Sequence, residues 1–291
     1  MLSRAEKNKK RNEKIKNEER RKKRKQKLLS TLKVLLGIII IIGSIVSYIY
    51  YVSTSQLIVR EYSYSYSKLP ENFNGLKIIQ IGDLYYDKNY KFILKELKTK
   101  IDKIKPDLIF FTGGLFNKNY NANSNDYTVV SNFFDSIDAS IGKYFVIGSN
   151  DDKKSVELLE KTHFKFLDNI SEEIFVNTPT PINIYGINEK SSKDALKNTD
   201  GFKIVLVNNP TNIDEIINSL SPDIIMAGKT LNGQIRIPFT DLNILNKDYK
   251  YFDSYYKVNN TDLFITGGIG TNNIPIRIFN HPNINFYRLK K

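Results

Sequence analysis

The hydrophobic positions of the chain form one long apolar stretch followed by many short apolar runs. Residues 34–52, VLLGIIIIIGSIVSYIYYV, contain no charged side chain. A helix rises about 1.5 Å per residue, so a helix of this length covers roughly the 30 Å hydrocarbon core of a bilayer. Tyr48, Tyr50 and Tyr51 stand at its far end, where amphipathic rings favour the membrane interface. The pattern predicts a transmembrane helix over residues 34–52.

Two alternative interpretations of this stretch are less favoured. A buried core helix would have the same composition. A cleaved signal peptide would need a shorter basic region before it and a small-residue cleavage site after it, and the chain has neither. A lipid-modified cysteine is excluded because the chain contains no Cys.

Beyond the apolar stretch, the pattern predicts an α/β sandwich. Residues 56–67 alternate with a strand period, and we expect the tyrosine–serine stripe there to be one face of an edge strand rather than a ligand site. Strands and helices then follow one another along the chain, which indicates layers of helix on sheet. Strands are expected at residues 76–81, 108–111, 143–147, 203–207, 223–227, 233–238, 263–267, 274–279 and 285–289, and helices at 91–104 and 127–137.

Five of these strands end in short polar or glycine-rich loops. The loop sequences are GDLYYD, TGGLFN, GSNDD, NNP and AGKTLNGQ. Ligand sites of open α/β sheets lie outside the carboxyl ends of the strands. We therefore expect the five loops to meet at one common site.

The net charge of +13 is concentrated before the apolar stretch. Residues 1–33 have a balance of +11, and the remainder has a balance of only +2. The positive-inside rule then places residues 1–33 in the cytoplasm and residues 53–291 outside it. A basic tail beside a membrane span favours anionic lipid headgroups, at about 1 kcal/mol per nearby Lys or Arg, over nucleic acid. We expect membrane lipids to be the partner of residues 1–52.

The amino-acid composition limits the chemistry that the chain can perform. The absence of Cys excludes disulfides, thiolate zinc sites and cysteine nucleophiles. Only two histidines are present, His163 and His281, and both lie outside the five loops. We expect them to be surface or turn residues, so that almost no imidazole is left for a metal centre.

The resemblance of this chain to a known family rests on six segments. They are LKIIQIGDL, PDLIFFTGGLFN, YFVIGSNDD, FKIVLVNNP, PDIIMAGKTLNGQIRIP and GGIGTNNIPIRIF. With their spacing, the chain from about residue 69 to residue 291 resembles the calcineurin-like metallophosphoesterases, particularly their membrane-associated bacterial branch. The resemblance implies a four-layer αββα sandwich with a dinuclear metal site at the strand ends. The expected division is a basic cytoplasmic tail (1–33), a transmembrane helix (34–52), a connecting segment or edge strand (53–68) and a phosphoesterase domain (69–291).

The metal-binding motifs of that family are degenerate here. The family holds two ions through D-x-H, G-D-x-x-D, G-N-H-D/E, a lone His and G-H-x-H, and Asp83 is the only ligand position of these that is retained. The substitutions are Tyr85 for the first His, Gly114 for the bridging carboxylate, Asn117 for the second acid, Ser149 for the ligating Asn, Asn150 for the catalytic His, Asn208 for the lone His, and Lys229 and Leu231 for the last two. We expect no catalytic residue and no cofactor. The alternative is a divalent metal, namely Mn, Fe, Zn or Mg.

Other chemistry at these loops has weaker support. Asp83, Asp87, Asp151 and Asp152 could form a carboxylate cluster for Mg²⁺ or Ca²⁺, although loop aspartates are more often helix caps or turns. Ser149 lacks a neighbouring base to make it a nucleophile. A further hypothesis pairs the ammonium of Lys229 with Asp83. A pocket lined by Tyr85, Asn150, Asn208 and Lys229 would suit an anionic or sugar-like ligand.

The sequence favours a single-pass membrane protein that displays an inactive pseudo-phosphoesterase domain outside the cytoplasm. Its role would be binding or scaffolding, with a protein or a small anionic ligand as partner. The alternative is an enzyme: a metal-dependent phosphoric ester hydrolase acting on phosphate esters at the membrane, with lipid-linked esters among the candidate substrates.

Overall fold

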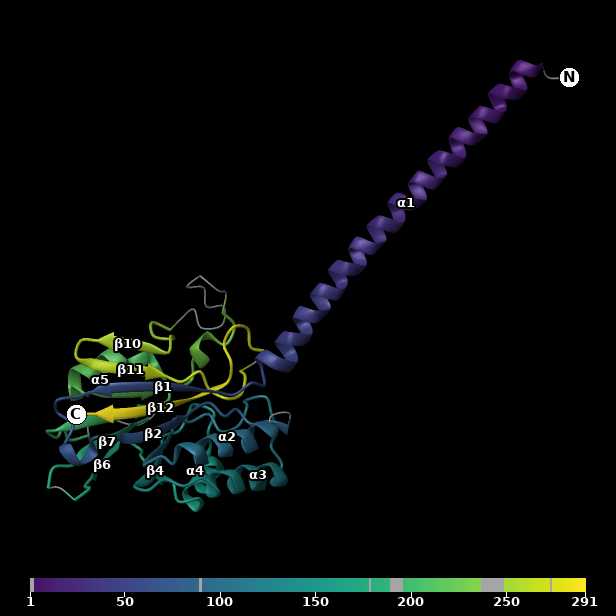
Figure 1. Cartoon of the computed structure of the whole chain (residues 1–291). Coiled ribbons are helices and arrows are strands. Elements are labelled where there is room, and N and C mark those ends of the chain that lie inside the picture. Colours follow the sequence, from purple (N-terminus) through teal and green to yellow (C-terminus); the bar gives the residue numbers. More distant parts are fainter. Residues whose placement is uncertain (1–2, 89–90, 178, 189–195, 237–248, 273) are drawn as a thin grey trace. The chain divides into compact units, whose positions relative to one another are not determined.

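The computed structural model of the protein contains two compact units, Met1–Ile49 and Tyr50–Lys291 (Figure 1). The structure describes residues 3–88, 91–177, 179–188, 196–236, 249–272 and 274–291. The functional boundaries expected within the first 68 residues stay predictions.

The N-terminal unit consists of one helix, α1 (Arg4–Tyr48), which runs without a break from the basic residues through the apolar stretch. A π-helical turn, η1 (Ile49–Ser53), follows it. The most apolar window of the helix has a mean hydropathy of 2.4, and none of that window is buried within the protein. The helix is therefore long and apolar enough to cross a membrane, and it is not the core helix of a globular domain.

Two six-stranded sheets form the centre of the second unit. The first has the order β1-β12-β2-β3-β4-β5 and the second the order β10-β11-β9-β8-β7-β6. The first sheet consists of β1 (Ile58–Ser65), β2 (Leu76–Ile81), β3 (Leu108–Phe111), β4 (Gly142–Phe145), β5 (Lys165–Phe166) and β12 (Asn283–Lys290). The second consists of β6 (Ile170–Ile174), β7 (Ile182–Ile187), β8 (Phe202–Val207), β9 (Ile224–Ala227), β10 (Tyr255–Val258) and β11 (Thr261–Ile265).

Three apolar cores separate four layers, because successive residues of a strand face opposite sides of its sheet. In β2, Ile79 and Ile81 pack with the helices α2 (Lys91–Ile104), α3 (Ser124–Asp135) and α4 (Lys153–Lys161). Ile78 of the same strand packs between the sheets, against residues of the second sheet. The far face of the second sheet packs against α5 (Ile213–Leu220). The predicted αββα sandwich is confirmed.

The edge-strand prediction for residues 56–67 is also confirmed. β1 pairs in parallel with β12 and ends the first sheet. Tyr62 and Tyr64 turn inward, and their rings lie 4.9 and 5.4 Å from that of Phe264. The tyrosine stripe is therefore part of the core between the sheets, and the alternating serines are exposed.

Two expected strands are absent from the described residues. Residues 233–238 and 274–279 share only the isolated bridge between Ile235 and Ile278, and residues 237 and 238 lie outside the described part. Left-handed backbone at Gln234 and Phe279, with φ of 42° and 51°, is incompatible with an extended strand. The second unit also contains three short 3-10 helical turns, η2 (Glu71–Phe73), η5 (Pro210–Asn212) and η6 (Leu231–Gly233).

Candidate functional site

The polar loops that follow β2, β3, β4, β8 and β9 meet at one end of the two sheets, as the sequence predicts. The backbone N–H of Asp83 donates to the carbonyl of Gly113, 2.8 Å away. Asn208 donates through Nδ2 to the carbonyl of Thr112, at 2.6 Å. Gly228 N–H then donates to the carbonyl of Asn208, at 2.9 Å. Direct hydrogen bonds therefore connect these loops.

Asp83, the retained ligand position, is completely buried. Its Oδ2 accepts a 2.6 Å hydrogen bond from the backbone N–H of Lys229, in the loop after β9. Burial raises the pKa of Asp83 to about 7, because a carboxylate loses its hydration there, and the Lys229 N–H opposes that rise. The carboxyl group of Asp83 therefore connects the loop after β2 to the loop after β9.

Gly114 occupies the position of the bridging carboxylate and is enclosed on the side where a side chain would project. Its φ is +78°, and a Cβ built on it would stand 2.9 Å from Oδ1 of Asp83 and 2.9 Å from Cε1 of Tyr85. Tyr85 itself is 5% exposed. The tyrosine ring therefore fills space beside the bridging position, and no added side chain would fit there without movement.

Asp151 has a structural role that the sequence did not single out. Its Oδ2 accepts from the N–H groups of Gly114 and Gly148, each at 2.7 Å, and its Oδ1 accepts from Leu115 N–H at 2.8 Å. Burial raises the pKa of Asp151, and these three donors act against that rise. Its partners come from two different loops, so only the adjacent pair of aspartates in GSNDD could have drawn attention to it.

The neighbouring Asp152 is a helix cap, which was one of the two interpretations open for these aspartates. Its Oδ1 accepts from Ser155 N–H at 2.9 Å, at the start of α4. Among the residues that the structure describes, no group of three His, Asp or Glu side chains is placed to hold a metal ion. The four-aspartate cluster is therefore not formed.

The remaining substituted positions differ in how deeply they are buried. Tyr85 and Asn208 are buried, at 5% and 4% exposure, whereas Asn150 is exposed. Leu231 is 2% exposed, and Ser149 is on the surface beside Asn150. The contact between Lys229 and Asp83 runs through the backbone N–H. The expected pairing of the Lys229 ammonium with Asp83 is not among the ion pairs of the described residues.

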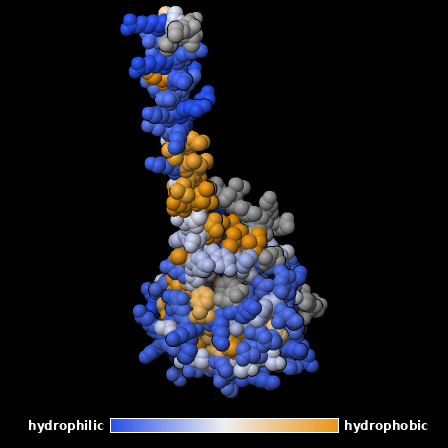
Figure 2. Space-filling model, turned by 90° about the vertical axis from the view of Figure 1, so that its right-hand side faces the viewer, coloured by the Kyte–Doolittle hydropathy of each residue, from blue (hydrophilic) through white to orange (hydrophobic). Residues whose placement is uncertain are grey.

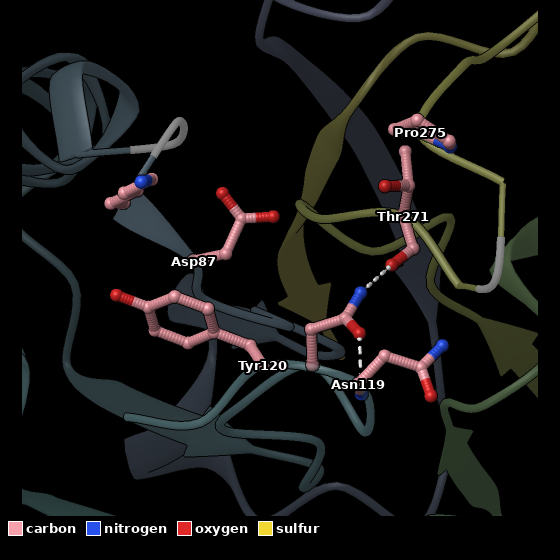
Figure 3. Close-up of a pocket in the computed structure, with 7 residues that line it drawn as sticks. Asp87, Asn119, Tyr120, Thr271 and Pro275 are labelled. Carbon is pink, nitrogen blue, oxygen red and sulfur yellow. Dashed lines mark hydrogen bonds between the residues drawn. The ribbon is translucent and has the colours of Figure 1, made fainter. Parts of the chain in front are cut away.

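A cavity of about 220 Å³ lies next to these loops (Figure 3). It is lined by Asp87, Lys88, Asn117, Asn119, Tyr120, Thr271 and Pro275. Asn117 donates through Nδ2 to the carbonyl of Thr271 at 2.7 Å and accepts at Oδ1 from Asn119 N–H at 2.9 Å. The amide that replaces the second acid therefore connects two loops at the wall of this cavity.

The residues present do not fit a pair of divalent ions. Such a pair requires several carboxylates or imidazoles, one of which bridges both ions. Asp83 supplies one carboxylate, and one of its oxygens already accepts from Lys229. His163 is exposed next to the end of α4, and His281 precedes β12, so neither histidine comes from the five loops.

Comparison with known proteins relates most of the globular unit to one family. Residues 76–269 match the calcineurin-like phosphoesterase family. An uncharacterized metallophosphoesterase of Bacillus subtilis, YkuE, is 25% identical over 262 residues, which cover 84% of this chain and 89% of that protein. A transmembrane protein with metallophosphoesterase domain from Danio rerio is 24% identical over 249 residues, which cover 77% of this chain and 55% of the other.

A third relative matches a shorter region. The UDP-2,3-diacylglucosamine pyrophosphatase LpxG of Chlamydia muridarum is 31% identical over 88 residues. These residues make up 29% of this chain and 26% of the relative, so most of that protein has no counterpart in the match.

Proposed function

Since this chain belongs to the calcineurin-like phosphoesterase family, we propose that it is a membrane-anchored member that has lost catalysis and acts by binding. The observation that carries this proposal is the closure of the bridging position. Gly114 has no side chain, and Asp83 and Tyr85 stand where a Cβ would need space. Two-metal phosphoesterase chemistry depends on a bridged ion pair that polarises the phosphate and generates the nucleophile.

The anchor is the apolar part of α1, and the proposed topology places the N-terminus in the cytoplasm. The apolar residues of the helix are exposed, for example Ile39 at 64% and Ile41 at 61%, so they require a nonpolar surrounding. The basic residues precede this part, as expected for a cytoplasmic flank. The globular unit is then extracytoplasmic.

Single-cysteine labelling tests this topology without background, because the chain has no native Cys. Ser3→Cys and Ser67→Cys place a thiol at exposed positions before and after the span. A membrane-impermeant maleimide should label Ser67→Cys in intact cells and Ser3→Cys only after permeabilisation. The reverse pattern would overturn the orientation.

A binding or scaffolding role is supported by what remains of the fold. The four-layer sandwich persists, and hydrogen bonds through Asp83, Asp151 and Asn208 connect the loops that would otherwise surround metal ions. A rigid loop surface of this kind suits recognition of a protein or a small anionic ligand.

The second candidate is a divalent-metal-dependent phosphoesterase acting on phosphate esters, including lipid-linked ones. It is favoured by the family membership and by the name of the Chlamydia relative, a UDP-2,3-diacylglucosamine pyrophosphatase. It would require metal ligands in addition to Asp83, because the described residues form no group of three His, Asp or Glu side chains around an ion.

Metal analysis and turnover distinguish the two candidates. The full-length protein in detergent is incubated with MnCl₂, desalted, analysed for bound metal, and assayed with p-nitrophenyl phosphate. We expect less than one tightly bound ion per chain and no turnover above that of Asp83→Ala. Stoichiometric metal together with turnover that is lost in Asp83→Ala and retained in Asp102→Ala, an exposed control in α2, would establish the enzyme instead.

A further inference from the structure

Residues 274–279, IPIRIF, have an inverted pattern of burial. Arg277 is completely buried, whereas Phe279 is 69% exposed and Ile274 is 40% exposed. In soluble proteins, arginine is mostly exposed and large apolar residues are mostly buried. The segment therefore presents apolar side chains outward while its one charged side chain points inward.

The buried guanidinium holds the segment in this orientation. Arg277 donates through Nη1 to the carbonyl of Gly267 at 2.8 Å and through Nε to the carbonyl of Gly270 at 3.1 Å. Phe279 has a backbone φ of +51°, which is uncommon for a bulky residue, so the surrounding contacts hold it in this conformation. The outward position of the phenyl ring is thus built into the fold.

The segment lies beside the residues that leave the apolar stretch. The backbone N–H of Arg277 donates to Oγ1 of Thr54 at 3.1 Å. Thr54 follows Val52, the last residue of the apolar stretch, by two residues, which can span at most about 7 Å. Ser53 and Thr54 are already buried within the globular unit, at 2% and 6% exposure. With the apolar stretch in a bilayer, this short covalent connection would keep residues 274–279 close to the membrane surface.

We propose that Ile274 and Phe279 form a membrane-contact patch that enters the interfacial region of the lipid bilayer. Phenyl and aliphatic side chains on a surface tethered at the bilayer partition into the headgroup–acyl boundary. Figure 2 shows hydrophobic side chains gathered on one face of the globular unit, within a mostly hydrophilic surface. The inference rests on the proposed membrane anchoring and does not depend on whether catalysis is lost.

Tryptophan fluorescence tests the patch directly, because the chain contains no Trp. The full-length Phe279→Trp variant is reconstituted into phosphatidylcholine–phosphatidylglycerol vesicles, with acyl-brominated lipid in one sample and aqueous acrylamide in another. We expect blue-shifted emission that is largely lost with brominated lipid and little affected by acrylamide. Ile274→Trp repeats the measurement if Phe279→Trp does not fold.

Phe175→Trp is the matched control. Phe175 is also exposed, at 54%, but it follows β6. The adjacent Val176 accepts from Asn72, and nearby Asn74 accepts from Lys291 N–H, just beyond the end of β12. Eight residues of β12, about 25 Å at 3.3 Å each, separate this end from the one near Thr54. Emission at this position should be quenched by acrylamide and not by brominated lipid.

The outcomes separate the patch from the anchor. Flotation of the full-length protein together with the vesicles measures whether the chain is anchored in the membrane. If the chain floats but the emission of the Phe279→Trp and Phe175→Trp variants is quenched alike, the membrane-contact patch is overturned and the membrane anchor is not. The same holds if emission of the Phe279→Trp variant is blue-shifted but insensitive to brominated lipid, a pattern that would indicate a protein partner or a second copy over the patch. A chain that does not float overturns both proposals.

Discussion

The backbone N–H of Lys229 donates a 2.6 Å hydrogen bond to Oδ2 of Asp83, so the loop after β9 is attached to the loop after β2 through a buried carboxyl group. In the metal-binding motifs of the calcineurin-like phosphoesterases, the residue at the position of Asp83 is a metal ligand. Here the same group stabilises the contact between two loops, so its protonation affects the stability of the folded unit.

The stability of the globular unit should decrease as the pH rises from about 4 to about 7. The pKa of Asp83 is about 7 in the folded protein and 3.8 in its reference state, so the folded state binds the extra proton in this range. The contribution lost is on the order of 4 kcal/mol. Asp83→Asn keeps an oxygen that can accept from Lys229 and does not ionise, so it should remove the part of the slope that Asp83 contributes and leave the part due to Asp151, whose pKa burial also raises. Denaturant unfolding at several pH values measures both proteins, and an unchanged slope in the variant would contradict the assignment.

Gly114→Ala should destabilise the unit more than Gly75→Ala. Both glycines have positive φ, +78° and +90°, so both substitutions carry the same kind of backbone strain. Only the Cβ at position 114 meets other atoms, Oδ1 of Asp83 and Cε1 of Tyr85 at 2.9 Å, whereas nothing lies within 4 Å at position 75. Overpacking should add about 1–3 kcal/mol at position 114. Thermal unfolding followed by circular dichroism compares the two, and equal losses would mean that the space at Gly114 is open.

Asp151→Ala should cost much more stability than Asp152→Ala. Removing the Asp151 carboxylate leaves three buried N–H groups without their acceptor, at about 1–3 kcal/mol each. Removing the Asp152 side chain takes away a helix cap, at about 1 kcal/mol. Denaturation midpoints of the two variants decide the matter. A similar small loss for both would show that Asp151 does not hold the loops together.

Arg277→Met should destabilise the unit by about 2–3 kcal/mol, because the buried carbonyls of Gly267 and Gly270 lose charged donors. Arg288→Met is the control: that side chain is 40% exposed, and its distance to Glu61 is 3.9 Å. The control should stay within about 0.5 kcal/mol of the wild type. If the two variants unfold alike, the guanidinium of Arg277 is not what fixes residues 274–279.

The parts of the fold that the sequence predicts are those in which apolar spacing and burial agree. β2, β8 and β9 are continuous apolar runs buried on both faces, and α2 has a strict helical spacing. β6, ISEEI, was not predicted because its polar side chains are mostly solvated at the edge of the second sheet. Residues 274–279 have the composition of a strand but form a loop, because the hydrogen bonds of Arg277 outweigh the apolar pattern.

At the site, residue types alone indicate which ligand positions differ from the family. They do not indicate which contacts the substituted side chains make. The role of Asp151 depends on N–H groups from two loops, and the closure at Gly114 depends on the ring of Tyr85 coming from a third. Such contacts depend on how segments that are distant in the sequence are placed in the fold. No local sequence pattern shows that placement. The expected ligand pocket of Tyr85, Asn150, Asn208 and Lys229 stays a prediction; the structure shows that Tyr85 and Asn208 are buried and that Asn150 is exposed.

The parallel pairing of β1 with β12 places a constraint on biogenesis. Among the described residues β1 pairs only with β12, and residues 66–282 separate the two strands along the chain. β1 must therefore wait for β12 to be synthesised before it has a partner in the first sheet. An incomplete chain held at the membrane would expose the edge of β2 and the inward-facing tyrosines of β1, which are surfaces that chaperones and proteases recognise. Synthesis of β12, rather than insertion of the helix, would then set the moment at which these surfaces become covered.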